Sequence, residues 1–251
     1  MLERWRAAGL LGPALLTLVT LPVLLVLGTW QLQRLGWKQD LIAKLEARVA
    51  AEPVSYTSVL AEFHKSSPDL NTGDVEYMRV RVTGTFDHAE ERHVYAPRSS
   101  SQGWNVFTLL KPEGGQPPVY VNRGWVPFSG YRDRLPDVSL TDTEQPVTVT
   151  GRVDTLPVEG MASGHSAPPA GAAWPKVTSF PHTGEIGAAL GHPVEERQVL
   201  LDPSMPDGYV RSWLPPGVPP ERHYSYAAQW WLFAATVGVL YGLLNLHKVN
   251  R

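Results

Sequence analysis

The chain has 251 residues, a formal net charge of −2 and no cysteine. A nearly balanced charge without a basic patch argues against nucleic acid as a partner. The lack of cysteine excludes disulfides, thiolate metal sites and a cysteine nucleophile, and the four scattered methionines argue against a copper carrier built on soft sulfur ligands.

Two apolar stretches lie at opposite ends of the sequence, at about residues 10–32 and 226–246. Each has about the 20 residues that an α-helix needs to cross a hydrocarbon core of about 30 Å. We therefore expect two transmembrane helices in the lipid bilayer, with one domain between them that is tethered at both ends. A signal peptide cleaved after Gly28 is an alternative, although the apolar run is longer than an ordinary signal core.

Basic residues near the two spans predict the orientation. Arg4 and Arg6 precede the first span, and Lys248 and Arg251 follow the second. By the positive-inside rule, this places both termini in the cytoplasm. Basic residues between positions 34 and 48 argue the other way, but long loops translocate largely regardless of their charge. We expect the central domain to lie outside the cytoplasm.

Helical spacing continues beyond the first span. Trp37, Leu41, Leu45 and Val49 recur at helical intervals, and Pro53 stops the pattern. Short runs rich in β-branched and aromatic residues then predict strands at 77–86, 93–96, 104–110, 119–126, 147–153 and 199–201. The result is a mainly β domain, either a small barrel or a sandwich.

Turn and helix signals complete the central domain. Pro112 to Gly115 predicts a hairpin turn, and residues 183–190 predict a helix that ends at Gly191. Residues 158–175, rich in glycine, alanine, serine and proline, predict a mobile loop, and residues 215–220 a stiff lead into the second span.

The predicted architecture is a membrane protein with two transmembrane helices that flank a mainly β (α+β) extramembrane domain. Its parts are a cytoplasmic N-terminus (1–9), a first span (10–32), a membrane-proximal helix (33–52), the mainly β domain (53–220), a second span (221–246) and a cytoplasmic tail (247–251).

Motifs of catalysis are missing from the sequence. It contains no phosphate loop, no glycine-rich dinucleotide turn and no Gly-x-Ser-x-Gly elbow. His88, Glu91 and His93 come nearest to a metal cluster, but they lack the helical i, i+4 spacing and lie between two predicted strands, where a polar turn is the favoured interpretation. The remaining histidines of the central domain have no evident partners. We therefore expect a protein that is not an enzyme.

The end of the first span carries one aromatic and two cationic side chains. Trp30, Arg34 and Lys38 follow one another at intervals of four residues, which predicts one stripe on a continuous helix. Ordinary anchoring at the membrane interface is one interpretation, since these residue types are common at helix ends. The other is a site that binds carboxylates.

The start of the second span contains His223 beside the aromatic residues Tyr226 and Trp230. A neutral imidazole can ligate haem iron, while an aromatic belt with a surface histidine is the alternative. Ala234, Gly238 and Gly242 form a line of small residues that predicts close packing on the first span. Such packing would bring His223 beside Arg34 and Lys38.

Several motifs in order resemble the Surfeit-locus family of cytochrome oxidase assembly factors, as in a bacterial member. They are Gly28-x-Trp30-Gln31-x-x-Arg34-x-x-x-Lys38, Val80-x-Val82-x-Gly84-x-Phe86, Val121-Asn122-Arg123-Gly124-Trp125-Val126-Pro127, Trp174-Pro175, Leu201-Asp202-Pro203 and Arg222-His223-x-x-Tyr226-Ala227-x-Gln229-Trp230. The resemblance covers nearly the whole chain, and its specificity comes from the combination rather than from any one motif.

The resemblance implies a non-enzymatic factor of the bacterial inner membrane, with its large domain in the periplasm, that helps to mature a haem-copper (cytochrome c type) oxidase. It implies transient binding of haem a, with His223 as the iron ligand. Partners would be the catalytic subunit of the oxidase and, as a second candidate, haem a synthase. The proposed haem site comprises His223, Arg34, Lys38, Trp30, Tyr226 and Trp230.

Two other functional classes stay open. One is an assembly scaffold that binds the oxidase subunit without contacting haem. The other is a membrane-anchored enzyme or sensor, which the missing catalytic motifs and the short tail after the second span disfavour.

The Arg123-Gly124 step predicts an unusual backbone. Gly124 permits angles that other residues avoid, and Pro127 closes the strand. Arg123 either belongs to a structural hydrogen-bond network, the favoured interpretation, or contacts a partner.

Overall fold

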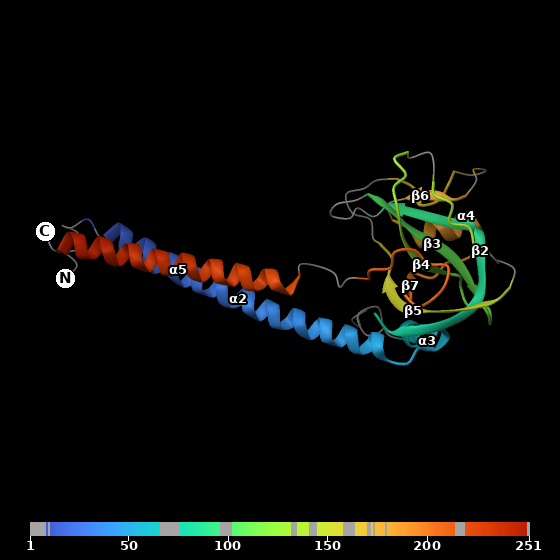
Figure 1. The fold of residues 1–251 in the computed structure, drawn as a ribbon, viewed down its shortest axis with the longest axis horizontal. Coiled ribbons are helices and arrows are strands. Elements are labelled where there is room, and N and C mark those ends of the chain that lie inside the picture. Colours follow the sequence, from blue (N-terminus) through green and yellow to red (C-terminus); the bar gives the residue numbers. More distant parts are fainter. Residues whose placement is uncertain are drawn as a thin grey trace. The chain divides into compact units, whose positions relative to one another are not determined.

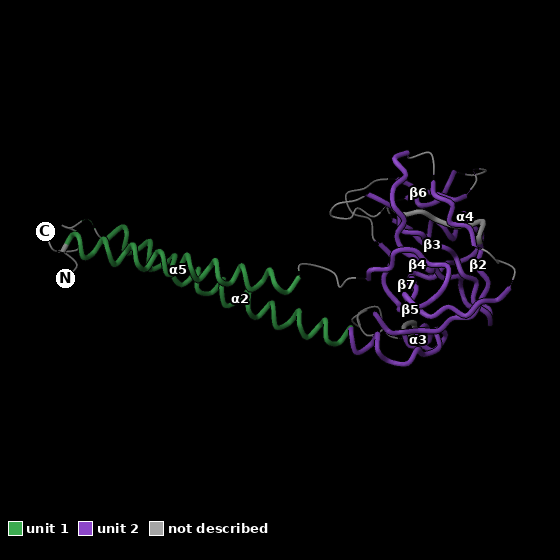
Figure 2. Tube along the Cα trace, viewed as in Figure 1, with its two compact units in different colours: residues 1–45, 215–251 green, residues 46–214 purple. Residues whose placement is uncertain are grey.

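The computed structural model describes residues 9, 11–65, 76–95, 102–131, 135–140, 145–157, 164–169, 172, 174–178, 180–213 and 219–249. These form two compact units, one from residues 1–45 and 215–251 and the other from residues 46–214 (Figure 2). The first unit is a pair of helices, and the second is a β-barrel with two short helices (Figure 1).

A single helix, α2 (Leu11–Ala50), covers both the first predicted span and the predicted membrane-proximal helix. The second long helix is α5 (Pro220–Val249). Both are long and apolar enough to cross a membrane. Many of their leucines and valines are exposed, including Leu16 (69%) and Leu18 (70%). Because a continuous surface of this kind is unstable in water, hydrocarbon is the solvent that suits it.

The two helices run antiparallel and pack along a seam with heptad spacing (Figure 1). On α2 the buried residues Leu24, Gly28 and Leu35 recur at intervals of four and seven. On α5 the buried residues Ala227 and Ala234 lie one heptad apart. Repeats of seven residues keep one side of each helix facing its partner over several turns.

Close contact between the two helices depends on Gly28. A Cβ atom built on Gly28 would lie 2.3 Å from Trp231 Nε1, far inside the contact distance, so only glycine fits under this indole ring. The close packing predicted for the line of small residues is confirmed at Ala234 but is wrong at Gly238 and Gly242. Within the described part of the chain, no heavy atom lies within 4 Å of a Cβ built on Gly238 or Gly242. The close approach therefore uses a glycine of the first span.

The central unit is built on one sheet with seven strands: β1 (Val54–Ser55), β2 (Arg79–Tyr95), β3 (Gly103–Pro112), β4 (Val119–Pro127), β5 (Val147–Thr155), β6 (Lys176–Thr178) and β7 (Arg197–Leu201). Strands β2, β3, β4, β7 and β5 pair in this order, and β5 pairs back with β2. The sheet therefore closes on itself, which decides between the two predicted architectures in favour of a barrel. Closure also removes exposed sheet edges.

Strand β2 makes closure possible because it belongs to two ladders. Its first half, from Arg79 to Gly84, pairs with β5, and its second half pairs with β3. Both ladders meet at Gly84, where an added Cβ would lie 2.3 Å from the carbonyl oxygen of Lys111. A glycine lets the backbones approach at this corner of the barrel.

The barrel interior is filled with aliphatic side chains. The main cluster of buried residues is Tyr56, Val59, Leu60, Val80, Val82, Leu110, Val119, Val121, Val149, Val153, Val199 and Leu201. The first three come from α3 (Tyr56–Lys65), a helix that the sequence analysis missed. The sequence does contain a helical pattern here, since these three residues follow i, i+3, i+4 spacing shortly after Pro53.

Several local predictions are confirmed. Pro112 to Gly115 connects the antiparallel strands β3 and β4, with φ of 89° at Gly114 and 77° at Gly115. Helix α4 (Thr183–Leu190) has the predicted bounds and ends at Gly191, whose φ is 76°. His182, for which the sequence suggested no partner, caps this helix by accepting a hydrogen bond from the N–H of Glu185.

Other local predictions need correction. Residues 77–96 do not form two strands with a turn between them, because β2 runs through the region with a shift of register between Asp87 and Arg92. The predicted turn is thus an irregularity inside one strand. The side chains of His88, Glu91 and His93 lie outside the described residues, and so does most of the lead at 215–220.

Part of the predicted mobile loop is anchored. Among the described residues 164–169, Ser166 is fully buried, and its hydroxyl donates to the carbonyl oxygen of Phe180 at 2.7 Å. The N–H of Ser166 donates to Glu185 Oε2 at 2.9 Å, and this hydrogen bond holds the pKa of the Glu185 carboxyl below its ordinary value. Loop composition could not reveal these contacts because their partners are distant in sequence.

Strand β4 contains a bulge at Arg123. Gly124 pairs with Val106 and Asn122 pairs with Phe107, which leaves Arg123 as the extra residue. The Arg123 side chain is buried, and it donates from Nε to the carbonyl oxygen of Asp207 (2.9 Å) and from Nη1 to that of Val138 (2.7 Å). The favoured structural interpretation of Arg123 is therefore confirmed.

Gly124→Val should destabilise the barrel. Gly124 has a φ of 113°, and an added Cβ would lie 2.9 Å from Arg211 Cγ and 3.0 Å from the carbonyl oxygen of Val210. Backbone strain and overpacking together should lower the free energy of unfolding by about 3 kcal/mol. The control Gly115→Val shares a positive φ but faces open space, so it should lose only about 1 kcal/mol. Equal losses in thermal unfolding of the two full-length variants would refute the packing argument.

Gly28→Leu should separate α2 from α5. Spin labels can be attached to cysteines introduced at the exposed positions Leu25 and Leu232. Because the native chain has no cysteine, no other position is labelled. We expect the distance between the labels to increase and its distribution to broaden. The control Gly238→Leu, at a position with free space, should leave the distance unchanged. A change of the same size in both variants would show that Gly28 has no special role in the pairing.

Candidate functional site

His223 lies in the first turns of α5 and is held by a residue of α2. Its Nδ1 atom is 2.7 Å from Gln31 Oε1, and the side chain is half-buried. Because an amide oxygen can only accept a hydrogen bond, the imidazole donates through Nδ1–H. In a neutral ring that donates in this way, the lone pair is on the other ring nitrogen, Nε2. This tautomer is the form in which histidine binds metals through Nε2.

Gln31 is a site residue that the sequence analysis missed. It lies between Gly28 and Leu35 at heptad spacing, so it belongs to the buried face of α2. The signal was a polar residue at a seam position in an otherwise apolar span.

The predicted stripe of Trp30, Arg34 and Lys38 divides between two environments. Trp30 is 52% exposed, and Arg34 is also exposed, with its guanidinium 4.0 Å from the ring centre of Trp37. Lys38 is only 6% exposed and lies on the buried face of α2. An interval of four residues rotates by about 40° around an α-helix, so two such intervals separate Trp30 from Lys38 by about 80°.

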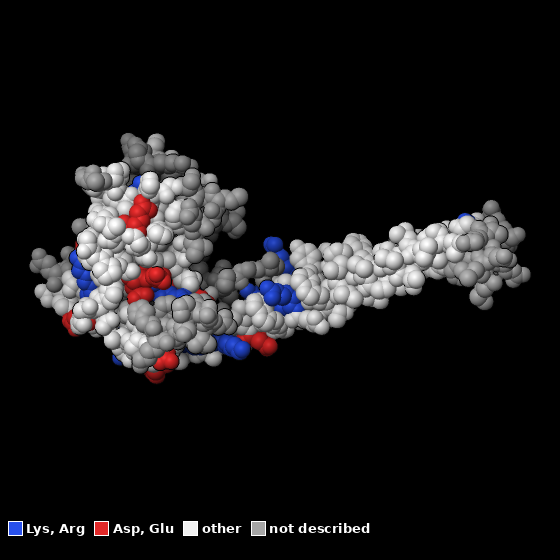
Figure 3. Space-filling view, turned by 180° about the vertical axis from the view of Figure 1, so that it is seen from behind, with Lys and Arg blue, Asp and Glu red and all other residues white. Residues whose placement is uncertain are grey.

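Aromatic side chains surround His223 on its own helix. Tyr226, three residues further on, is exposed, whereas Trp230 is half-buried and meets Phe233 edge to face at a centroid distance of 6.2 Å. Figure 3 shows no charged side chain along the middle of the helical pair on the face drawn, and the blue side chains lie toward its ends. In the sequence, His223 follows the charged residues Glu221 and Arg222 and precedes the apolar part of α5.

The helical pair carries an imidazole, exposed aromatic rings and the Arg34 guanidinium. Groups of these kinds are the ones that proteins use to bind a flat apolar metal complex with carboxylates. They do not form an acid–base pair or a metal site made of protein ligands alone. Within the described residues, no group of three or more His, Asp or Glu side chains is placed to hold a metal ion.

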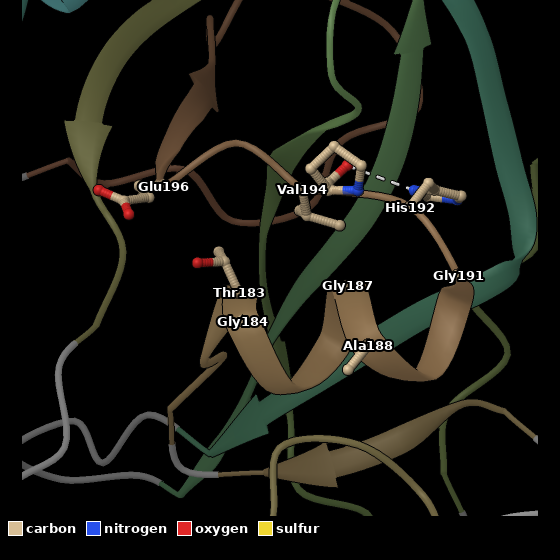
Figure 4. A pocket seen from close by; sticks show the side chains of 9 residues that line it. Thr183, Gly184, Gly187, Ala188, Gly191, His192, Val194 and Glu196 are labelled. Carbon is tan, nitrogen blue, oxygen red and sulfur yellow. Dashed lines mark hydrogen bonds between the residues drawn. The ribbon is translucent and has the colours of Figure 1, made fainter.

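The barrel contains a second candidate site beside α4 (Figure 4). It is a cavity of about 480 Å³ that faces Gly184, Gly187, Ala188 and Gly191, with His192 toward one end. His192 Nδ1 lies 3.3 Å from the carbonyl oxygen of Pro193. The small residues of α4 leave space above the helix. The lining residues do not form a pair of nucleophile and base. The helical pair is the better candidate.

The model of the SURF1 family matches residues 18–235, which cover most of the chain. Surfeit locus protein 1 of Homo sapiens is 33% identical over 150 residues, or 48% of this chain and 47% of that protein. The Gallus gallus protein of the same name is 32% identical over 145 residues, or 51% and 43%.

A relative from yeast carries a functional name. Cytochrome oxidase assembly protein SHY1 of Saccharomyces cerevisiae is 37% identical over 103 residues, or 40% of this chain and 24% of that protein. The matched region is less than half the length of each of these three relatives. The family match extends from the first apolar helix through the barrel into the second. The chain belongs to the SURF1 family.

Proposed function

We propose that this chain is a membrane-anchored assembly factor for a haem-copper oxidase, and that it binds haem a and passes it to the catalytic subunit. Membership of the SURF1 family supports the first part, since the yeast relative is named a cytochrome oxidase assembly protein. The second part depends on one observation, the hydrogen bond of 2.7 Å between His223 and Gln31.

That hydrogen bond prepares His223 for iron. In the neutral ring it keeps the proton on Nδ1 and orients the ring from the neighbouring helix, which leaves Nε2 for the iron. Haem a would supply the iron and a flat apolar body with two propionates. Trp30 and Tyr226, both exposed, suit the body, and Arg34 suits a carboxylate. Lys38 is the weaker candidate for a propionate because its side chain is buried.

The proposed partners follow from the chemistry of haem a. Haem a is poorly soluble in water, so a carrier whose iron ligand lies at the end of a membrane helix suits transfer along the bilayer. The receiving partner would be the oxidase subunit that holds haem a, and haem a synthase is the candidate donor. We place the protein in the bacterial inner membrane with the barrel in the periplasm.

The proposed topology predicts the activity of alkaline phosphatase fusions. The enzyme inserted near Pro168 in the barrel should be active, because alkaline phosphatase folds only outside the cytoplasm, and a fusion after Arg251 should be inactive. Cell fractionation confirms that both fusions reach the membrane. The reverse pattern of activity would contradict the orientation and would move His223 to the cytoplasmic side.

His223→Ala should remove bound haem while leaving the protein in the membrane. The measurement is the visible absorption spectrum of protein purified from cells that make haem a, at matched expression. His247→Ala, at the other end of the same helix, is the control and should keep the wild-type spectrum. If His223→Ala binds haem as wild type does, His223 is not the ligand, and a scaffold that binds the oxidase subunit without contacting haem becomes the better explanation.

Gln31 should affect the affinity for haem and the reduction potential of bound haem without being a ligand of the iron. Gln31→Leu removes the acceptor and should weaken haem retention by roughly 10- to 100-fold, the usual effect of losing such a partner. Gln31→Glu offers a stronger acceptor, makes the imidazole more electron-rich and should lower the haem reduction potential. A purely structural role for Gln31 would leave that potential unchanged wherever haem still binds.

A further inference from the structure

A further cavity lies in the barrel unit, on the outer face of the sheet and apart from the one beside α4. It is a cavity of about 270 Å³ lined by Val49, Arg79, Gly151, Arg152, Leu200, Asp202, Pro203, Arg211 and Trp213. Its floor is formed by β2, β5 and β7, whose alternate residues Val80, Val153 and Val199 point into the barrel core. Its walls come from the end of α2 and from the segment after β7.

Two guanidinium groups oppose each other on this floor. Arg79 of β2 is the cross-strand partner of Arg152 of β5. Like charges directly opposite each other destabilise an antiparallel pair, so this arrangement needs an anion nearby. Three arginines and one aspartate line the cavity, which leaves an excess of two positive charges.

The single carboxylate of the lining is already engaged. Asp202 Oδ2 accepts from Arg79 Nη2 at 2.9 Å, and Oδ1 accepts from the N–H (3.0 Å) and the hydroxyl (2.7 Å) of Ser204. Burial raises the pKa of the Asp202 carboxyl, but these hydrogen bonds outweigh it and hold the pKa below its ordinary value. Asp202 therefore stays ionised and neutralises Arg79 only.

Arg152 keeps hydrogen-bonding capacity. Its Nε is buried without a hydrogen-bond partner among the described residues, and its guanidinium lies 5.7 Å from the ring centre of Tyr77. Asp154 interacts with its charge, yet burial lowers the pKa of Arg152 on balance. Arg211 donates to the carbonyl oxygens of Asp202 (2.6 Å) and Met205 (2.8 Å), which are neutral acceptors.

We propose that this cavity binds an oxyanion, a carboxylate or phosphate group attached to an apolar body. Guanidinium forks match the geometry of both anions, and a buried N–H without a partner is costly until a ligand satisfies it. The apolar body follows from Val49, Leu200 and Trp213, which line the same cavity. The site is separate from the proposed haem ligand, so the two proposals can fail independently.

The test measures the binding of small anions to the full-length protein in uncharged detergent. Inorganic phosphate, acetate and hexanoate are titrated by calorimetry at constant ionic strength in chloride. Tighter binding of hexanoate than of acetate identifies a carboxylate on an apolar body, and tighter binding of phosphate identifies a phosphorylated compound. If none of the three binds above the chloride background, the proposal is wrong.

Arg152→Gln separates a ligand-binding role from a structural one. It should weaken binding of the tightest anion about tenfold, because one charged donor is lost, while the melting temperature without anion stays the same or rises as the repulsion with Arg79 disappears. Arg81→Gln, an exposed arginine on the same strand but outside the lining, is the control and should bind normally. Equal weakening in both variants would reduce the effect to overall charge and overturn the site.

A second variant keeps the test decisive if Arg152→Gln does not fold. Val49 is 37% exposed on the end of α2, so Val49→Glu should fold while placing a carboxylate at the edge of the cavity. Anion binding should then fall about tenfold or more, because the new carboxylate repels the ligand and competes for the arginines. Ala47→Glu adds the same charge to an exposed position outside the lining, and it should bind as wild type does. Unchanged binding by Val49→Glu would contradict the proposal.

Discussion

The helical unit depends on a polar contact inside an apolar seam. Gln31 and His223 meet at 2.7 Å between helices whose other seam positions are mostly apolar. A slide of either helix by one turn, about 5.4 Å, would leave both side chains unpaired beside hydrocarbon. Apolar contacts alone tolerate such slides, so the polar pair fixes the register. The contact of Gly28 with Trp231 sets how closely the helices approach.

The barrel depends on a different constraint, the space between backbones where strands change partners. An added Cβ would lie 2.3 Å from a carbonyl oxygen at Gly84 and 2.4 Å from one at Gly151. A ring of five strands curves sharply, and glycine is the residue that allows such close crossings. Gly124 serves the bulge of β4 in a similar way, since its φ of 113° suits few other residues. Arg211 packs closely on the sheet in the same region, because a Cβ added to Gly124 would lie 2.9 Å from Arg211 Cγ.

Local patterns predicted most of the fold, and long-range pairing accounts for the rest. The hairpin at Pro112 to Gly115 and the helix at 183–190 follow from turn residues and caps that lie within a few positions of one another. Barrel closure, by contrast, requires residues 79–84 to meet residues 147–152, which no local pattern reveals. The candidate site divides in the same way. His223 is visible as a residue type at a helix end, whereas its partner Gln31 is 192 positions away.

Two arginines of the barrel differ in their hydrogen bonding. One is bonded within the fold, and the other keeps a donor that a ligand could use. Arg123 is more deeply buried, yet its guanidinium donates to two carbonyl oxygens and to Thr108, so its desolvation is compensated inside the fold. Arg152 is only half-buried, but it faces another arginine across the ladder, and its buried Nε–H has no acceptor among the residues that the structure describes. A fold selected for stability alone would gain from replacing Arg152 by a neutral residue. Its presence in a cavity with two further arginines is the reason for proposing a bound anion there.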